Sequence, residues 1–218
     1  MTDVMEKPQQ DAASTTQDFD VLIIGAGISG IGMAARLAMQ CPNKSYVMLD
    51  RRERLGGTWD LFRYPGIRSD SDMHTLGFSF EPWTHEKSIA DGPAILEYLD
   101  RITDKYELNE TLRLGQKVIS ADWDSKTATW TVVTESADGQ HSRYKGRFLF
   151  LGAGYYDYDD PYDAGFKGRD KFKGQVIHPQ FWPSNLDYAG KKVVVIGSGA
   201  TAVTIVPAMA KGGAAHVT

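Results

Sequence analysis

The sequence predicts an α/β fold that repeats one local unit, a buried strand followed by a glycine-rich turn and a helix. The first unit covers residues 19–39 and the second begins at residue 193. Between them, residues 117–136 and 142–151 alternate as strands around Ala137-Asp138-Gly139, which is a hairpin turn signal. Strands that alternate with helices indicate parallel pairing with helices packed on the sheet, so we expect two domains of this kind.

The composition is that of a folded globular protein. Hydrophobic residues make up 42% and charged residues 24% of the chain. The net charge of −4 gives no support for a nucleic acid or an anionic membrane as partner. Residues 1–18 are polar and are expected to form a disordered tail. The longest apolar stretch, residues 21–39, is broken by glycines and Arg36, so a membrane-spanning helix is not expected and the predicted location is the cytoplasm.

Cysteine and histidine usage excludes two kinds of chemistry. Cys41 is the single cysteine, so the chain can form neither an internal disulfide nor a CxxC redox pair. The five histidines show no HExxH or similar ligand spacing. We therefore predict no metal site and no dithiol chemistry.

The first unit has the complete order of a dinucleotide-binding βαβ motif. Residues 19–24 predict a buried parallel strand, and Gly25-Ala26-Gly27-Ile28-Ser29-Gly30 predicts the turn. Residues 28–39 predict a helix, and residues 46–49 predict a second strand that ends on Asp50. A GxGxxG sequence alone is a weak signal, but the strand, helix and acidic residue all lie where the Rossmann fingerprint requires them.

Each glycine of this motif has a physical role. Gly25 allows the tight turn after the strand, Gly27 lets the backbone approach a pyrophosphate, and Gly30 lets helix and strand pack closely. The helix N-terminus then offers free N–H groups and a positive dipole to the phosphates. Asp50, twenty residues after Gly30, is placed to bind ribose hydroxyls. The alternatives are a purely structural turn and a solvated acid at a strand end.

A second copy of the motif lies near the end of the sequence. Residues 193–196 predict a buried strand, and Gly197-Ser198-Gly199-Ala200-Thr201-Ala202 predicts the turn, with alanine tolerated at the third position. The following helix reaches Gly212 and contains Pro207, which should kink or loosen it. Residues 216–218 begin another strand. This copy implies a second dinucleotide, most naturally a nicotinamide one; the alternative is a structural repeat without a ligand.

Two dinucleotides without redox cysteines restrict the chemistry. One cofactor would carry hydride in, and a flavin would pass electrons to a diffusible acceptor. Oxygen is a candidate acceptor because it needs no pair of protein residues to receive the electrons. The residues by themselves lead no further.

Two further stretches carry a family resemblance. Gly56-Gly57-Thr58-Trp59 and the segment RYPGIRSD at residues 63–70 resemble the flavin-contacting loop of Baeyer–Villiger flavin monooxygenases. Residues 172–183 fit that family's fingerprint, FxGxxxHxxxW followed by Pro or Asp. The neighbouring flavin-containing and N-hydroxylating monooxygenases have Tyr or Phe in place of Trp182. The resemblance runs from about residue 19 to the end and is strongest to the ethionamide-activating branch.

The resemblance implies a reaction and its cofactors. NADPH would reduce FAD, and the reduced flavin would capture O2 as a C4a-peroxyflavin. This species would insert one oxygen atom into a ketone to give an ester or lactone, or oxygenate a sulfide or thioamide. The implied partners are O2 and a small ketone or sulfur-containing substrate, and bound NADP would help keep the site dry.

The resemblance also implies individual site residues. Asp70 corresponds to the active-site carboxylate that orients a catalytic arginine; the alternative is a loop carboxylate that caps a turn. Arg63 could equally form a surface ion pair, His178 is expected to have a structural role, and Trp182 is expected to pack in the core. The predicted cofactor-binding residues are Gly25, Gly27, Ser29, Gly30, Asp50, Gly57, Thr58, Trp59, Asp60, Leu61, Arg68, Ser69, Asp70, Val118, Gly197, Ser198, Gly199, Ala200, Thr201, Ala202 and Val203.

The predicted architecture is α/β, with two dinucleotide-binding Rossmann-like domains (FAD and NADP) of the glutathione-reductase type, the second truncated. After the tail, residues 19–155 form the N-terminal part of the FAD-binding domain, residues 156–189 a linker with the fingerprint, and residues 190–218 the start of the NADP-binding domain. The family is more than twice as long, so the catalytic arginine and the 2′-phosphate-binding residues are expected beyond Thr218. The chain is therefore read as a fragment or a truncated product. A non-catalytic FAD-binding remnant is one alternative, and a flavin N- or S-monooxygenase, disfavoured by Trp182, is another.

Overall fold

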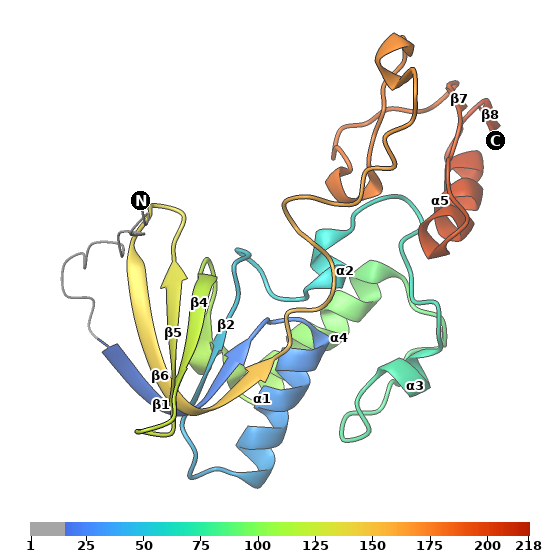
Figure 1. Ribbon diagram of the computed structural model, residues 1–218. Coiled ribbons are helices and arrows are strands. Elements are labelled where there is room, and N and C mark those ends of the chain that lie inside the picture. Colours follow the sequence, from blue (N-terminus) through green and yellow to red (C-terminus); the bar gives the residue numbers. More distant parts are fainter. Residues whose placement is uncertain (1–15) are drawn as a thin grey trace, which may run out of the picture.

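The computed structural model describes residues 16–218 and has two parts, each an α/β arrangement (Figure 1). The larger part holds a six-stranded sheet, and the smaller part holds a two-stranded sheet with one helix. In Figure 1 the helix α5 and the strands β7 and β8 lie at the upper right, away from the large sheet. Residues 1–15, which make up most of the predicted tail, lie outside the described residues.

The helices and strands follow the predicted order. The larger part contains β1 (Thr16–Ile24), α1 (Ile28–Gln40), β2 (Tyr46–Leu49), α2 (Thr58–Leu61), α3 (Met73–Leu76), α4 (Gly92–Lys105), β3 (Leu112–Arg113), β4 (Lys117–Asp124), β5 (Thr129–Glu135) and β6 (His141–Leu151). The smaller part contains β7 (Lys192–Val193), α5 (Ala200–Lys211) and β8 (His216–Val217). Short 3₁₀ turns lie at Leu108–Thr111, Arg169–Lys171 and Pro179–Phe181. Helix α5 continues through Pro207.

The large sheet joins a parallel and an antiparallel half in the order β3-β2-β1-β6-β5-β4. Strand β1 runs parallel to β2 and β6, while β4, β5 and β6 are antiparallel. Strand β6 serves both halves, because it pairs with β5 through residues 141–146 and with β1 through residues 143–151. The predicted hairpin and the predicted βαβ unit are therefore one continuous sheet.

The core lies on both faces of this sheet. On one face, side chains of β1 and β2 pack against α1 and α4; the fully buried members include Ile23, Ile31, Met48, Ile95, Leu99 and Ile102. On the other face a smaller cluster is formed by Leu22, Val47, Leu49, Val132 and Tyr144. Burial on both faces explains why β1 and β2 are continuous apolar runs, as parallel strands in α/β proteins usually are. No helix within residues 16–218 is long and apolar enough to cross a membrane.

Two predicted boundaries were wrong. Residues 16–18, assigned to the disordered tail, belong to β1, because β6 extends far enough to pair Thr16 with Arg143. The predicted strand at residues 193–196 is shorter, since only Lys192 and Val193 belong to β7. Its one partner within the described chain is the two-residue strand β8, and Val194 and Ile196 are exposed. Pairing with neighbours, rather than local apolar character, sets the length of both strands.

Candidate functional site

The candidate site lies where β1 and β2 end. The N–H of Gly25 donates to the carbonyl of Leu49 at 2.8 Å, which closes the turn against β2. The N–H of Ala26 donates to Oδ2 of Asp50 at 2.7 Å, and Asp50 is only 7% exposed. The N–H of Gly56 donates to the carbonyl of Ala26 at 2.8 Å. The glycine turn, the acidic residue and the loop at residue 56 are thus held together directly.

Close backbone contacts fix the first glycine turn. Gly25 has a φ of +102°, and a Cβ on it would lie 2.4 Å from the carbonyl oxygen of Gly152. A Cβ on Gly30 would lie 1.8 Å from the carbonyl oxygen of Gly25. Sequence reasoning missed Gly152. Its signal is the Gly-Ala-Gly run at residues 152–154 that directly follows β6, as Gly25-Ala26-Gly27 follows β1.

The turn leaves a cradle of backbone. Helix α1 begins at Ile28 with Gly27 as its N-cap, and no side chain caps it. The first N–H groups of a helix have no acceptor within the helix, so they are available to an anion. Gly57 lies against Gly27, where a Cβ on Gly57 would be 2.9 Å from the Cα of Gly27. Ser29 is exposed beside them. Two backbone segments and a helix N-terminus therefore meet with no side chain between them.

Strand β4 starts beside the same acidic residue. The N–H of Gln116 donates to the carbonyl of Asp50 at 2.8 Å. Val118, two residues further on, is half-buried in β4 and pairs with Thr134. The structure therefore brings Val118 to the end of β2, near Asp50.

Helix α2 carries the next predicted residues, and their side chains do not all face the glycine turn. Thr58 and Trp59 are half-buried, and Trp59 packs against the core on the α1 face. Leu61 is 9% exposed and packs instead against Ile205 and Met209 of α5. A cofactor-binding role for Thr58, Trp59 and Leu61 remains a prediction.

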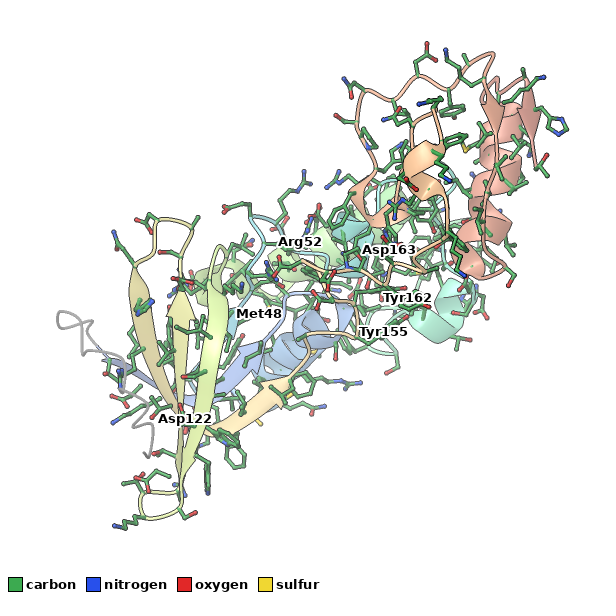
Figure 2. The ribbon with its side chains drawn as sticks, turned by 45° about the horizontal axis from the view of Figure 1, so that its top comes forward. Met48, Arg52, Asp122, Tyr155, Tyr162 and Asp163 are labelled. Atoms are coloured by element: carbon green, nitrogen blue, oxygen red, sulfur yellow. The ribbon has the colours of Figure 1, made fainter. Side chains whose placement is uncertain are left out.

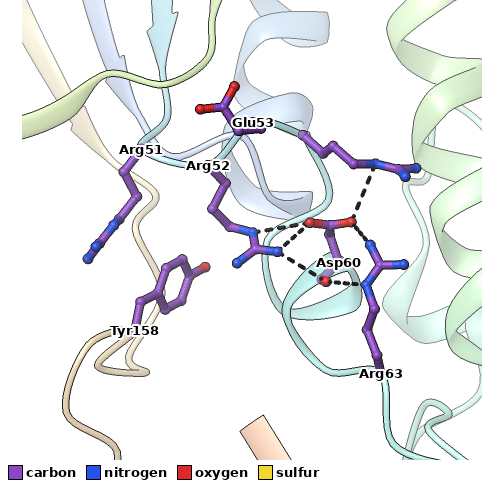
Figure 3. Close-up of a pocket in the computed structure, with 7 residues that line it drawn as sticks. Arg51, Arg52, Glu53, Asp60, Arg63 and Tyr158 are labelled. Carbon is purple, nitrogen blue, oxygen red and sulfur yellow. Dashed lines mark hydrogen bonds and ion pairs between the residues drawn. The ribbon is translucent and has the colours of Figure 1, made fainter. Parts of the chain in front are cut away.

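Asp60 is the centre of an arginine cluster (Figure 3). Its side chain is 2% exposed, and Oδ2 lies 2.5 Å from Nη2 of Arg52. Arg63 also pairs with Oδ1, and Nε of Arg54 lies 3.5 Å from the same oxygen. The Asp60 carbonyl accepts from Arg52 at 3.2 Å and from Arg63 at 3.1 Å. Arg63 thus forms an ion pair whose acidic partner is buried, and the Asp60 carboxylate is occupied by protein cations.

An open pocket of about 430 Å³ adjoins this cluster; it is lined by Arg51, Arg52, Glu53, Arg54, Asp60, Arg63 and Tyr158. Arg51 binds Asp159 through two hydrogen bonds of 2.9 and 2.6 Å, which lower the pKa of Asp159 and raise that of Arg51. Burial raises the pKa of Tyr158, whose ring lies 5.7 Å from the guanidinium of Arg52. The pocket is cationic on one side and aromatic on the other, a combination suited to an anionic or planar group.

The loop that carries Asp70 is anchored just before that residue. Ser69 is buried; its N–H donates to the carbonyl of Ala90 at 2.8 Å, and its Oγ accepts from the N–H of Ala90 at 3.1 Å. Arg68 and Asp70 are exposed. Within the part of the chain that the structure describes, the Asp70 carboxylate has no hydrogen-bond partner, so it caps no turn there. Burial raises the pKa of Tyr156 to about 12, with Tyr155 and then the charge of Asp70 acting in the same direction.

The second glycine turn is open. Residues 197–200 and Val203 are exposed, and Thr201 and Ala202 are half-buried. Gly197 has a φ of +146°, and a Cβ on Gly197 or Gly199 would meet no atom within 4 Å. Helix α5 itself is held by Ile205 and Met209, which pack on Leu61, Phe62 and Tyr64. The seven predicted residues from Gly197 to Val203 therefore lie together at an accessible helix N-terminus.

The fingerprint residues form a structural turn between the two parts. Nδ1 of His178 accepts from the N–H of Gln180 at 3.2 Å, and Trp182 packs with the cluster around α5. The structural roles expected for both remain predictions. Gln180, which sequence reasoning missed, is 5% exposed and donates through Nε2 to the carbonyl of Asp157 at 2.7 Å. Tyr155 and Tyr162 lie exposed between the two parts (Figure 2). In residues 16–218 no three His, Cys, Asp or Glu side chains gather as metal ligands would.

Comparison with known proteins places this geometry in a family. A family model described as pyridine nucleotide-disulphide oxidoreductase matches residues 22–218. The chain belongs to that family. The FAD-containing monooxygenase EthA of Mycolicibacterium smegmatis is 56% identical over 203 residues, which are 93% of this chain and 41% of that protein. The probable FAD-binding monooxygenase AlmA of Acinetobacter baylyi is 52% identical over 199 residues, 91% of this chain and 40% of that protein.

Solved structures give the same result for the fold. The crystal structure of cyclohexanone monooxygenase from Rhodococcus sp. Phi1 bound to NADP+ matches with a TM-score of 0.77 and 31% identity, over 93% of this chain and 38% of that one. The resemblance to Baeyer–Villiger and EthA-type flavin monooxygenases is therefore confirmed, and so is the α/β fold class. The chain spans about 40% of the length of the curated relatives it matches. The disulphide in the family description has no counterpart here, since Cys41 is the single cysteine.

The contact at Gly30 predicts a large loss of stability on substitution. In Gly30→Ala the new methyl group would meet the backbone of Gly25, which no rotamer change can relieve, so we expect a decrease of about 3 kcal/mol in the free energy of unfolding. Gly199→Ala, in the second turn, is the matched control with open space, and should lose less than about 1 kcal/mol. Urea denaturation of both variants checks this, and equal losses would contradict the packing argument.

The arginine cluster predicts that Asp60 stabilises the fold. Asp60→Asn keeps the shape but removes the one buried negative charge that Arg52, Arg54 and Arg63 share, and we expect a decrease of about 2 kcal/mol in the free energy of unfolding. Asp122→Asn is the control, because Asp122 is exposed on β4 far from the cluster (Figure 2). If thermal or urea denaturation finds the two variants equally stable, Asp60 does not have this role.

Proposed function

We propose that this chain is the N-terminal, cofactor-binding part of an FAD- and NADPH-dependent monooxygenase. The proposed enzyme inserts one oxygen atom of O2 into ketones, and it also oxygenates sulfides and thioamides. The observation that carries the proposal is the buried Asp50 bonded to the first glycine turn, in a chain 56% identical to an FAD-containing monooxygenase. In this proposal residues 19–155 belong to the FAD-binding domain, residues 156–189 to the linker, and residues 190–218 to the NADP-binding domain.

The residues present fit FAD at the first turn. Gly27 and Gly57 lie close together without side chains, so a pyrophosphate could approach their backbone, and the N-terminus of α1 offers its free N–H groups. The Asp50 carboxylate accepts one backbone N–H at each oxygen, from Ala26 and from Arg52. A carboxylate has about four acceptor positions, so it retains capacity for two ribose hydroxyls. Val118, in the strand that starts beside Asp50, is the residue proposed to meet the adenine.

The second turn fits a nicotinamide dinucleotide. Its glycines face open space, and α5 begins directly behind them, so the backbone N–H groups of residues 199–202 would meet the NADPH pyrophosphate. The positions proposed to bind it are Gly197, Ser198, Gly199, Ala200, Thr201, Ala202 and Val203. When both are bound, FAD supplies the redox chemistry with O2, after reduction by NADPH.

Asp70 is the proposed catalytic residue of this chain. It is exposed next to the anchored Ser69, and its carboxylate is unoccupied within residues 16–218, so it is available to hold a guanidinium by charge-assisted hydrogen bonds. Arg68 and Ser69 complete the proposed flavin-facing edge.

FAD binding provides the direct test of the first site. The 218-residue chain, purified and mixed with FAD, should bind it and turn yellow, whereas Asp50→Ala should lose most of this binding because both the ribose acceptor and the Ala26 contact disappear. We expect the dissociation constant for FAD to rise about 10-fold or more, measured by absorbance and flavin fluorescence. Asp122→Asn serves as the control. Full FAD occupancy in Asp50→Ala would remove the assignment of Asp50.

Turnover tests the reaction itself. In the full-length protein, NADPH oxidation in the presence of O2 and a phenyl ketone should yield an ester. Asp70→Ala should reduce its formation about 100-fold, because the guanidinium that it orients would lose its position. FAD binding should be unchanged. A protein that binds FAD but never oxidises NADPH would support a non-catalytic FAD-binding remnant instead, and unchanged ester formation in Asp70→Ala would exclude Asp70 as catalytic.

A further inference from the structure

One loop, residues 64–70, touches both parts of the molecule, and we call it the bridging loop. At Gly66 its backbone lies directly on α5. Gly66 has a φ of +87°, and a Cβ there would lie 2.5 Å from the carbonyl oxygen of Thr204 and 2.7 Å from the Cβ of Ala208. In Figure 1 the chain leaves α2 and passes next to α5 at this point. Any side chain at residue 66 would force the loop and the helix apart.

The other end of the bridging loop is bound to the segment before α4. The N–H of Gly92 donates to the carbonyl of Ile67 at 3.0 Å, and Arg68 forms a β-bridge with Asp91. Ser69 exchanges hydrogen bonds with Ala90. Helix α4 in turn packs against α1 in the core. The loop is therefore firmly held by the larger part and cannot yield independently if α5 is displaced.

On the helix side, the contact lies close to the second glycine turn. Thr204 is 4% exposed, and its Oγ1 donates to the carbonyls of Ala200 and Thr201 at 3.0 and 3.1 Å. The Oγ1 atom also lies 3.4 Å from the Tyr64 hydroxyl oxygen. Ala200 is the first residue of α5, so Gly66 contacts the helix little more than one turn from the N–H groups that follow Gly199.

We propose that Gly66 is a positioning residue that sets the placement of the second glycine turn relative to the loop carrying Asp70. The proposal rests on the proposed function, in which the second turn binds NADPH and Asp70 faces the flavin. Because the bridging loop is rigid, a displacement at Gly66 is transmitted to Asp70, which follows only four residues later. A larger residue on either side of the contact shifts α5 and weakens the coupling between NADP binding and the flavin site, while FAD binding stays intact.

Four variants isolate this contact. Gly66→Ala adds the colliding methyl group, and Gly168→Ala is its control, because Gly168 has nearly the same φ, +80°, with no atom within 4 Å of its Cβ position. Ala208→Leu enlarges the helix side of the same contact. Its control is Ala210→Leu, since Ala210 is exposed on the same helix. The second pair keeps the test decisive even if Gly66→Ala fails to fold.

The first measurement needs no cofactor. Spin labels on Cys41, which is exposed at the end of α1, and on a cysteine introduced by Lys211→Cys at the end of α5 report the distance between the two parts. The parent and both controls should give the same narrow distance distribution by pulsed electron paramagnetic resonance. Gly66→Ala and Ala208→Leu should shift or broaden it. Distributions identical to that of the parent in both of these variants overturn the proposal.

The second measurement separates positioning from general stability. In the full-length protein loaded with FAD, Gly66→Ala and Ala208→Leu should raise the KM for NADPH about 5-fold or more with a smaller change in kcat, and leave FAD affinity unchanged. The double variant Gly66→Ala with Ala208→Gly should recover part of this loss, because one of the two colliding groups is removed. Equal losses of FAD and NADPH affinity overturn the proposal. Failure of the parent to bind FAD would instead overturn the proposed function.

Discussion

The backbone of the first glycine turn packs on itself and on two other backbone segments, and the arrangement of the site depends on these contacts. Gly30 lies against the carbonyl of Gly25, Gly25 against Gly152, and Gly27 against Gly57. No side chain can lie between surfaces this close, so α1, the end of β6 and the loop before α2 converge on one point. Asp50 adds the side chain that ties the turn to β2. This packing leaves a cradle of backbone at the N-terminus of α1, with the exposed Ser29 beside it, and this cradle is the proposed phosphate site.

The arginines around α2 stabilise a buried carboxylate, that of Asp60. Asp60 lies in the motif that resembles a flavin-contacting loop, yet its carboxylate binds three arginines and is shielded from solvent. A buried carboxylate is unfavourable unless it is paired and fully hydrogen-bonded, and the cluster provides both conditions. Arg52 follows β2 and Arg63 follows α2, so their shared partner fixes the short helix relative to the sheet. Asp60, which the motif predicted as a cofactor-binding residue, therefore stabilises the position of α2.

The sequence predicted those features of the fold that depend on residues close together in the chain. Apolar runs, the glycine turn and the spacing to Asp50 gave the βαβ unit, because each reflects a requirement within about thirty residues. Contacts between distant segments were not predictable in this way. Gly152 supports Gly25 across more than a hundred residues, and Thr16 is a strand residue only because β6 is long. The predicted length of the strand at residues 193–196 was wrong for the same reason, since it depends on the partner strand β8.

The two glycine turns share a motif but are held in different ways. The first is fixed from within, by glycines that contact each other and the sheet, and its third position must be Gly30. The second has Ala202 at that position and open space around Gly197 and Gly199. What holds its helix is a face two turns long, where Ile205 and Met209 pack on Leu61, Phe62 and Tyr64, and where Gly66 permits close approach. The placement of the second turn is thus determined by the loop that continues to Asp70, which belongs to the larger part. The motif that the sequence repeats is therefore held by its own glycines in one copy and by packing against the larger part in the other.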